Sequence, residues 1–294
     1  MARVCSSSLA WMCAAGSALG AVLSGCSGDT VTLGRAPRAG ELILHLASPD
    51  DDENPSLTAD LLELYFSSDR EGGEGDVDLW VARRASPNDP FGEPTNLSEL
   101  NTEEFESSPA VSADGLTLWF GSDREGGAGG TDVWVARRES RDAAWGEATN
   151  VSELSSEGDD IPRPLGAGDT VMPLARRDEG GVYLTYFARR ASVDEPFDAP
   201  VLVQLAAEGV EVVDAWLNAR GDELWFKQRT TDRKGDLFVA RADASGAFLA
   251  PKPAPLVNTA AEERDPWLSA DGSRLFFASD REGSIDIFEL ELSR

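Results

Sequence analysis

Residues 67–84 read SSDREGGEGDVDLWVARR, and residues 121–138 read GSDREGGAGGTDVWVARR. The two stretches lie 54 positions apart and share most of their letters. The end of the stretch recurs as LTYFARR, DLFVAR and DIFELEL. Aligned on one position, the five copies are spaced by 54, 52, 52 and 50 residues, at Ala82, Ala136, Ala188, Ala240 and Leu290. Such a period is typical of proteins built from stacked structural repeats.

Each unit contains further short apolar runs. A second run precedes every copy, as in LELYFSS (62–68) and LTLWFGS (116–122). A lead-in stands before three of these runs (PSLTAD, PAVSADG and PWLSADG), and a looser segment such as DPFGEPTNLSEL follows four of the units. The apolar runs are rich in Val, Leu, Phe and Trp, and they have the length of strands rather than helices. This pattern therefore predicts four strands in each unit.

Both faces of these strands are predicted to be buried, because Leu118, Trp119 and Phe120 are consecutive. A sheet with one face in water would instead alternate apolar and polar residues. Five units of four strands, packed against each other on both sides, predict an all-β fold, a five-bladed β-propeller.

The two ends of the chain supply complementary pieces of one unit. The fifth unit stops at Arg294 without its fourth strand, whereas residues 41–46 form an apolar run with no strands before it. Leu46 stands nine residues before Pro55, as Leu100 stands nine before Pro109. We therefore expect 41–46 to complete the last blade and remove the open edge of the ring. His45, the single histidine, is interpreted as a residue of this strand rather than a catalytic group.

The units resemble the TolB-type, WD-like propeller repeats of bacterial envelope proteins. The resemblance rests on the motifs S-x-D-G, F-x-S-D-R and D-[LVI]-[WF]-V-A-R, covers about 41–294, and is clearest in units 1, 2 and 5. Unit 3 lacks the S-D-R motif. TolB itself has a six-bladed propeller and a separate domain, and this chain has neither a sixth unit nor a segment for that domain. The resemblance implies an exported binding or scaffolding module rather than an enzyme.

The first 26 residues, MARVCSSSLAWMCAAGSALGAVLSGC, read as a targeting segment whose only charge is Arg3. The end of the segment is similar to the lipobox of bacterial lipoproteins, which implies cleavage before Cys26 and acylation of that cysteine. We expect a signal peptide over 1–25, lipidated Cys26 with a flexible tether over 26–40, and the propeller over 41–294. Ser27 resembles an outer-membrane sorting signal. An ordinary secretory signal with a chance cysteine is the alternative.

The charge of the chain excludes one class of partner. Lys and Arg number 26 against 53 Asp and Glu, for a formal net charge of −27. A phosphate backbone repels such a surface, so we expect no nucleic-acid binding. Cations and basic proteins are attracted instead. The three cysteines all lie at or before residue 26, which leaves the expected propeller without a disulfide, a cysteine metal site or a thiol nucleophile. We expect a monomer that contacts the membrane through its lipid anchor only.

The repeated SDREGG loop has two interpretations. In the structural interpretation, Asp69, Asp123 and Asp280 accept backbone N–H groups within the turn, and the following arginines pair with nearby acids. In the alternative, the loop holds calcium, with Asp76 and Asp78 as weak candidate ligands. Unit 2 has Gly130 in place of Asp76, so the structural interpretation is favoured and no cofactor is expected.

Charge is predicted to differ between the two faces of the ring. We call the five segments that lead into the units the entry loops; all carry acids, and they cover residues 48–54, 101–107, 155–160, 207–214 and 259–265. They predict an acidic rim on one face, and the paired arginines that end VARR and FARR lie on the other. Unit 4 breaks the pattern with KQRTTDRKGD (227–236). Arg229, Arg233 and Lys234 are therefore the candidate contacts for a partner.

Three functions fit these observations. The first is a lipid-anchored, non-catalytic propeller that binds an envelope protein, with an outer-membrane location. The second is a glycoside-cleaving propeller with carboxylates at the channel mouth. The third is glycan binding through aromatic residues such as Phe91, Trp145 and Phe197, although their matching positions in the repeats suggest packing. No catalytic residue can be singled out from the sequence.

Overall fold

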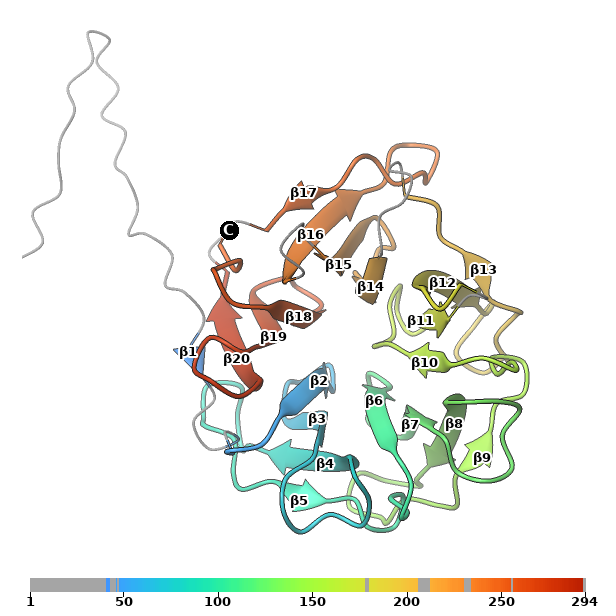
Figure 1. The fold of residues 1–294 in the computed structure, drawn as a ribbon, viewed down its shortest axis with the longest axis vertical. Coiled ribbons are helices and arrows are strands. Elements are labelled where there is room, and N and C mark those ends of the chain that lie inside the picture. Colours follow the sequence, from blue (N-terminus) through green and yellow to red (C-terminus); the bar gives the residue numbers. More distant parts are fainter. Residues whose placement is uncertain are drawn as a thin grey trace, which may run out of the picture. The chain divides into compact units, whose positions relative to one another are not determined.

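The computed structural model describes residues 41–42, 46, 48–177, 180–205, 212–229, 234–254 and 256–292. These residues form twenty strands and no helix. The strands make five antiparallel sheets of four, arranged around a common centre (Figure 1). The predicted five-bladed β-propeller is thereby confirmed. No helix among the described residues has the length and hydropathy to cross a membrane.

The first three strands of each blade run outward from the axis in chain order (Figure 1). The innermost strands are β2 (Asp52–Leu57), β6 (Glu106–Val111), β10 (Asp160–Pro162), β14 (Val212–Leu217) and β18 (Glu263–Leu268). The second strands are β3 (Glu63–Ser68), β7 (Thr117–Ser122), β11 (Val171–Arg177), β15 (Glu223–Arg229) and β19 (Arg274–Ser279). The third strands are β4 (Asp78–Arg83), β8 (Asp132–Arg137), β12 (Tyr183–Arg189), β16 (Gly235–Arg241) and β20 (Asp286–Glu291). Short outer strands finish four blades, namely β5 (Thr95–Asn96), β9 (Thr149–Asn150), β13 (Val201–Leu202) and β17 (Lys252–Pro253).

The fifth blade takes its outer strand from the other end of the chain. Strand β1 (Glu41–Leu42) pairs antiparallel with β20, with Glu41 opposite Glu289 and Leu42 opposite Phe288. Ring closure by the N-terminal segment is therefore confirmed at these two residues. The strand is shorter than the predicted 41–46, because Leu46 lies in a turn. His45 lies outside the described residues.

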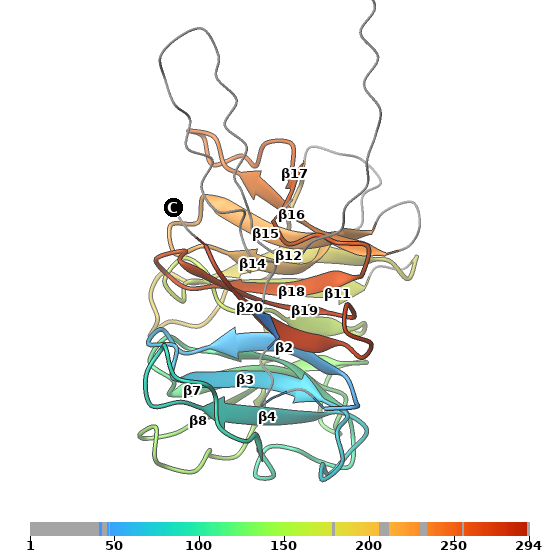
Figure 2. The same ribbon diagram turned by 90° about the vertical axis from the view of Figure 1, so that its left-hand side faces the viewer.

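The hydrophobic core lies between the blades rather than inside any one of them. Tyr65 and Phe66 are adjacent in β3 and are both fully buried. Tyr65 packs in the cluster between blades 1 and 2, and Phe66 packs in the cluster that joins blades 1, 4 and 5. Consecutive side chains of a strand point to opposite faces of the sheet. Consecutive apolar residues therefore fill two different cores, which explains the absence of alternation in the sequence. Figure 2 shows the blades edge-on, with β2, β3 and β4 side by side.

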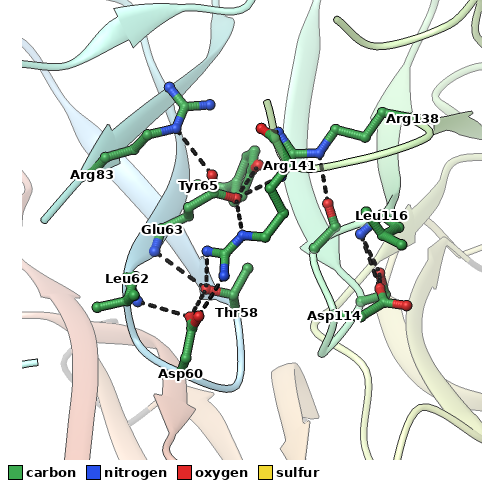
Figure 3. Close-up of polar contacts among 12 residues, drawn as sticks. Thr58, Asp60, Leu62, Glu63, Tyr65, Arg83, Asp114, Leu116, Arg138 and Arg141 are labelled. Carbon is green, nitrogen blue, oxygen red and sulfur yellow. Dashed lines mark hydrogen bonds and ion pairs between the residues drawn. The ribbon is translucent and has the colours of Figure 1, made fainter. Parts of the chain in front are cut away.

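A buried glutamate ties blade 1 to blade 2. The Glu63 side chain accepts hydrogen bonds from Arg83 Nε at 3.0 Å, Tyr65 OH at 2.9 Å and Arg138 Nη2 at 2.6 Å. Arg138 belongs to blade 2, and its side chain is 1% exposed. Arg141, also from blade 2, pairs with both Glu63 and Asp60 (Figure 3). The Glu63 carboxylate of blade 1 therefore joins this sheet to the neighbouring sheet of blade 2 through side-chain contacts.

Candidate functional site at the propeller axis

The repeated loop serves the blade that carries it. Asp69 accepts the backbone N–H of Asp51 at 2.8 Å, and Asp123 accepts that of Phe105 at 3.0 Å. Asp280 likewise accepts the N–H of Glu262 at 2.7 Å. These donors lie in the entry loops, 18 residues earlier in the chain. The expectation that these aspartates bond within their own turn was wrong, because their side chains instead fix the entry loop to the turn.

The arginine of the S-D-R motif is also structural. Arg70 pairs with Asp52 at 2.5 Å, and Arg124 pairs with Glu106 at 2.9 Å; both acids are fully buried in innermost strands. The Arg70 guanidinium also lies 5.0 Å from the ring of Phe66. The predicted pairing of this arginine with a nearby acid is confirmed. Part of the acidity predicted for the rim is consequently neutralised inside the blades.

The calcium candidates differ in their surroundings. Asp76 is exposed. The Asp78 carboxylate accepts the backbone N–H of Glu74 at 2.7 Å and that of Gly75 at 3.3 Å. A Cβ atom on Gly73 would lie 1.6 Å from the Asp78 carboxylate. Asp78 therefore shapes the turn, and no group of three or more candidate metal ligands occurs among the described His, Cys, Asp and Glu residues.

The paired arginines have two different roles. The first of each pair, such as Arg83, is exposed. The second is buried or half-buried and lies over an aromatic ring, with Arg84 at 4.2 Å from Phe91 and Arg138 at 4.4 Å from Trp145. Phe91, Trp145 and Phe197 are 2 to 6% exposed. Glycan binding by these three aromatic side chains is therefore excluded, and their repeated position reflects packing.

The blade 4 candidates lie at one end of a hairpin. Arg229 ends β15 and stands opposite Gly235 at the start of β16, next to Lys234. Both side chains are exposed, and Lys234 Nζ lies 4.0 Å from the Asp280 carboxylate. Arg233 lies outside the described residues. The structure thus brings Arg229 and Lys234 together at one end of the β15–β16 hairpin.

A different set of residues converges on the axis. In four blades the innermost strand has a bulge, where the register shifts and a non-glycine residue takes a left-handed φ. These residues are Asn54, Ser108, Asp214 and Asp265, with φ of 58°, 53°, 55° and 51°. Together with Arg163 and neighbouring prolines, they line an axial cavity with about 220 Å³ of empty space, its mouth included.

Blade 3 departs from this pattern for a local reason. Pro162 stands where the other blades have the left-handed residue, and the proline ring holds φ near −65°. Strand β10 consequently pairs with β11 without a register shift. The next residue, Arg163, reaches across the axis instead. Its Nη2 lies 2.5 Å from Asp214 Oδ1, and its Nη1 lies 3.0 Å from Asp265 Oδ1.

A second cation of the chain contacts each of Asp214 and Asp265. Lys227 Nζ lies 3.2 Å from Asp214 and 3.1 Å from Glu262. Arg264 lies 3.1 Å from Asp265 and 3.0 Å from Glu53. The network joins four of the five blades; Arg163, Asp214, Asp265 and Lys227 are buried in it, whereas Glu53, Arg264 and Glu262 are partly exposed.

The network sets the protonation of its carboxyl groups. Burial opposes ionisation of Asp214, but Arg163 and Lys227 hold its pKa well below the ordinary value. Burial and the Asp214 charge together raise the pKa of Asp265. Burial raises the pKa of Glu53 to about 7; Arg264 opposes the shift, whereas Asp265 and Asp214 add to it. Glu53 is therefore an axial carboxyl group with a pKa near neutrality.

Sequence reasoning did not single out the axial site. Asp214 and Asp265 were placed on an acidic rim with the rest of their entry loops, but both are buried. The sequence predicts no role for Arg163 and places Glu53 only on the acidic rim, within residues 48–54. A signal existed in the repeat alignment, because Asn54, Ser108 and Asp265 each precede a proline at matching positions. The rim itself is present in part, with Asp51, Glu103, Glu104 and Glu157 exposed.

Comparison with known proteins finds likeness of fold only. No family model and no curated protein matches the sequence. Among solved structures, TolB from Acinetobacter baumannii matches at 13% identity with a TM-score of 0.54, covering 85% of this chain. An endo-arabinase from Bacteroides thetaiotaomicron matches at 11% identity with a TM-score of 0.59, covering 87% of this chain and 98% of its own. The catalytic domain of the Coprinopsis cinerea GH62 alpha-L-arabinofuranosidase matches at 12% identity with a TM-score of 0.52, covering 87% of this chain and 94% of its own.

The lengths of these proteins also differ. This chain spans 56% of the Acinetobacter TolB, whose remaining part has no counterpart in the match. The fold neighbours therefore include both TolB proteins and glycoside-cleaving propellers. Identities of 11 to 13% leave the choice of function to the residues of the site.

Proposed function

We propose that this chain is a non-catalytic binding module of the bacterial cell envelope, anchored by lipid at Cys26 and recognising a protein partner on its entry-loop face. The observation that carries the proposal is the pairing of the axial carboxylates. Asp214 and Asp265 each contact two cations of the chain, and Glu53 contacts Arg264. Among the described residues, Asp214, Asp265 and Glu53 thus each face a cation of the chain.

Glycoside cleavage requires a different arrangement. A general acid must be protonated when it meets the leaving oxygen, and a second carboxylate must act from the opposite side of the sugar. Cations neutralise Asp214 from two sides, which weakens it as a base or nucleophile. Arg163 also occupies the space between Asp214 and Asp265. These contacts support binding over catalysis.

The partner is expected to be basic where it meets the rim. Asp51, Glu103, Glu104 and Glu157 are exposed on the face where the entry loops meet the SDREGG turns. Charge of one sign steers an oppositely charged partner and makes association sensitive to salt. Arg229, Arg233 and Lys234 remain candidate contacts on blade 4. The envelope location rests on the lipobox at Cys26 and on the resemblance to TolB repeats, and Ser27 favours the outer membrane.

One observation favours the alternative function. Glu53 is a carboxyl group at the axis whose pKa is about 7, which is the range suited to a general acid. The endo-arabinase and the alpha-L-arabinofuranosidase named above share the fold. If the chain cleaves glycosides, Glu53 is the residue expected to donate the proton.

A single set of variants separates the two functions. Detergent-solubilised full-length protein is crosslinked in envelope extract beside a Glu103→Lys/Glu104→Lys variant and a control, Arg83→Ala, on the opposite face. The proposal expects one partner that the rim variant loses and the control retains. Sugar release from arabinan that disappears in Glu53→Gln, with no partner captured, would instead establish the enzyme.

A further inference from the structure

The Arg163 guanidinium has acceptors from three other blades. Nη2 meets Asp214 Oδ1 at 2.5 Å, while Nη1 meets Asp265 Oδ1 at 3.0 Å and Asn54 Oδ1 at 2.7 Å. The two terminal nitrogens of the planar Arg163 guanidinium thus contact three side-chain oxygens. Such a fork recognises planar groups of acceptors in a way that an ammonium point charge does not. The geometry is that of a receptor for a guanidinium group.

The acceptors do not depend on Arg163 for their positions. Lys227 holds Asp214 from the other side, and Arg264 Nε holds Asp265 at 3.1 Å. Asn54 is fixed by its left-handed backbone and donates from Nδ2 to Ser67 Oγ at 2.9 Å. Proline rings line the same cavity and restrict its backbone. The receptor would therefore keep its shape if the guanidinium left.

Arg163 itself satisfies the site incompletely. Arg163 is 8% exposed, yet its Nε has no hydrogen-bond partner among the residues that the structure describes. A buried donor without a partner costs about 1–3 kcal/mol. An arginine that entered from the mouth with all its donors satisfied would therefore compete with Arg163 for the same oxygens. The negative net charge of the chain would attract such a cationic group.

We propose that the axis is a guanidinium-binding site that the chain's own Arg163 occupies, and that an arginine side chain of the partner enters it by displacing Arg163. This proposal rests on the proposed function for the identity of the guest as a protein partner. The receptor itself rests only on the contacts of Asp214, Asp265 and Asn54. Arg163 thereby acts as an internal competitor that sets the affinity of the site.

The receptor is tested without any partner. In the full-length detergent-solubilised Arg163→Ala protein, the melting temperature should fall, and millimolar methylguanidinium should restore most of the loss. Methylammonium at the same concentration should restore little. The control is Arg220→Ala, because Arg220 has a side chain 77% exposed and a single ion pair with Asp222. This control should show neither the loss nor the recovery.

Two further measurements keep the proposal open to refutation. Adding Asp214→Asn to Arg163→Ala should abolish the recovery by methylguanidinium. In the wild type, a short peptide with one arginine should bind more tightly than its lysine counterpart, and Arg163→Ala should strengthen the arginine peptide further. Equal recovery of the melting temperature by methylguanidinium and methylammonium would overturn the receptor. If Arg163→Ala fails to fold, equal binding of the arginine and lysine peptides to the wild type would overturn it instead. Recovery without any envelope partner would keep the receptor and reject only the proposed function.

Discussion

The seam between blades 1 and 2 is expected to depend on the negative charge of Glu63. Substituting Glu63→Gln keeps the size of the side chain but removes the charge that Arg138 faces. The Arg138 side chain is 1% exposed, so its charge would be left buried and uncompensated. Breaking a buried ion pair from one side costs about 3–5 kcal/mol. We expect a loss of that size in the free energy of unfolding.

A matched variant separates burial from charge. Arg83 also contacts Glu63, at 3.0 Å, but its side chain is 48% exposed. Exposed ion pairs contribute about 0–1 kcal/mol, so Arg83→Ala should cost little. Urea denaturation followed by tryptophan fluorescence measures both variants. The reasoning fails if Glu63→Gln loses no more stability than Arg83→Ala.

The stability difference between the wild type and Glu63→Gln should also depend on pH. Although burial opposes ionisation, hydrogen bonds from Arg83 and Arg138 lower the pKa of Glu63. A carboxyl group with a lowered folded-state pKa stabilises the fold above its unfolded pKa, which is about 4.3 for glutamate. This contribution is lost as the pH falls through the folded value. The difference in stability between wild type and Glu63→Gln should therefore be constant above about pH 5 and shrink in more acidic solution.

Three further changes have defined outcomes. Gly73→Ala should destabilise the fold by about 1–3 kcal/mol, because its Cβ would lie 1.6 Å from the Asp78 carboxylate. Gly92→Ala, whose nearest neighbour would be 3.4 Å away, is the control in urea denaturation. Deletion of 41–46 should abolish the single cooperative thermal transition, since it removes the outer strand of blade 5 and buried Leu46; a calorimetric transition that keeps its enthalpy would contradict closure. Cys26→Ser should move the protein from the membrane to the soluble fraction, and unchanged fractionation would disprove lipid anchoring at this residue.

The repeat pattern carried most of the information about the fold. The spacing of Ala82, Ala136, Ala188, Ala240 and Leu290 fixed the number of blades, because each unit can bury its faces only against its neighbours. The register of Leu46 with Leu100 predicted which strand closes the ring. The aspartates of the SDREGG turn were assigned the correct role but the wrong partner. Their donors lie 18 residues upstream, beyond the range of local turn patterns.

The axial site could not be assembled from the sequence in the same way. Arg163 meets Asp265, which lies 102 residues further along the chain. Nothing in either local stretch indicates the other. The contact depends on Pro162, which removes a bulge that four other blades keep. A single proline in the repeat thus redirects the following side chain, and only the closed ring shows where it ends.

Strand β1 has a consequence for how the protein is made. Glu41 pairs with Glu289, which is synthesised 248 residues later. The first described strand therefore has no partner until residue 289 has been translated. Blades 1 to 4 can form in order as they emerge, but the fifth sheet and the ring wait for β20, and contacts of such long range fold slowly. A ring built this way stays open until β1 meets β20.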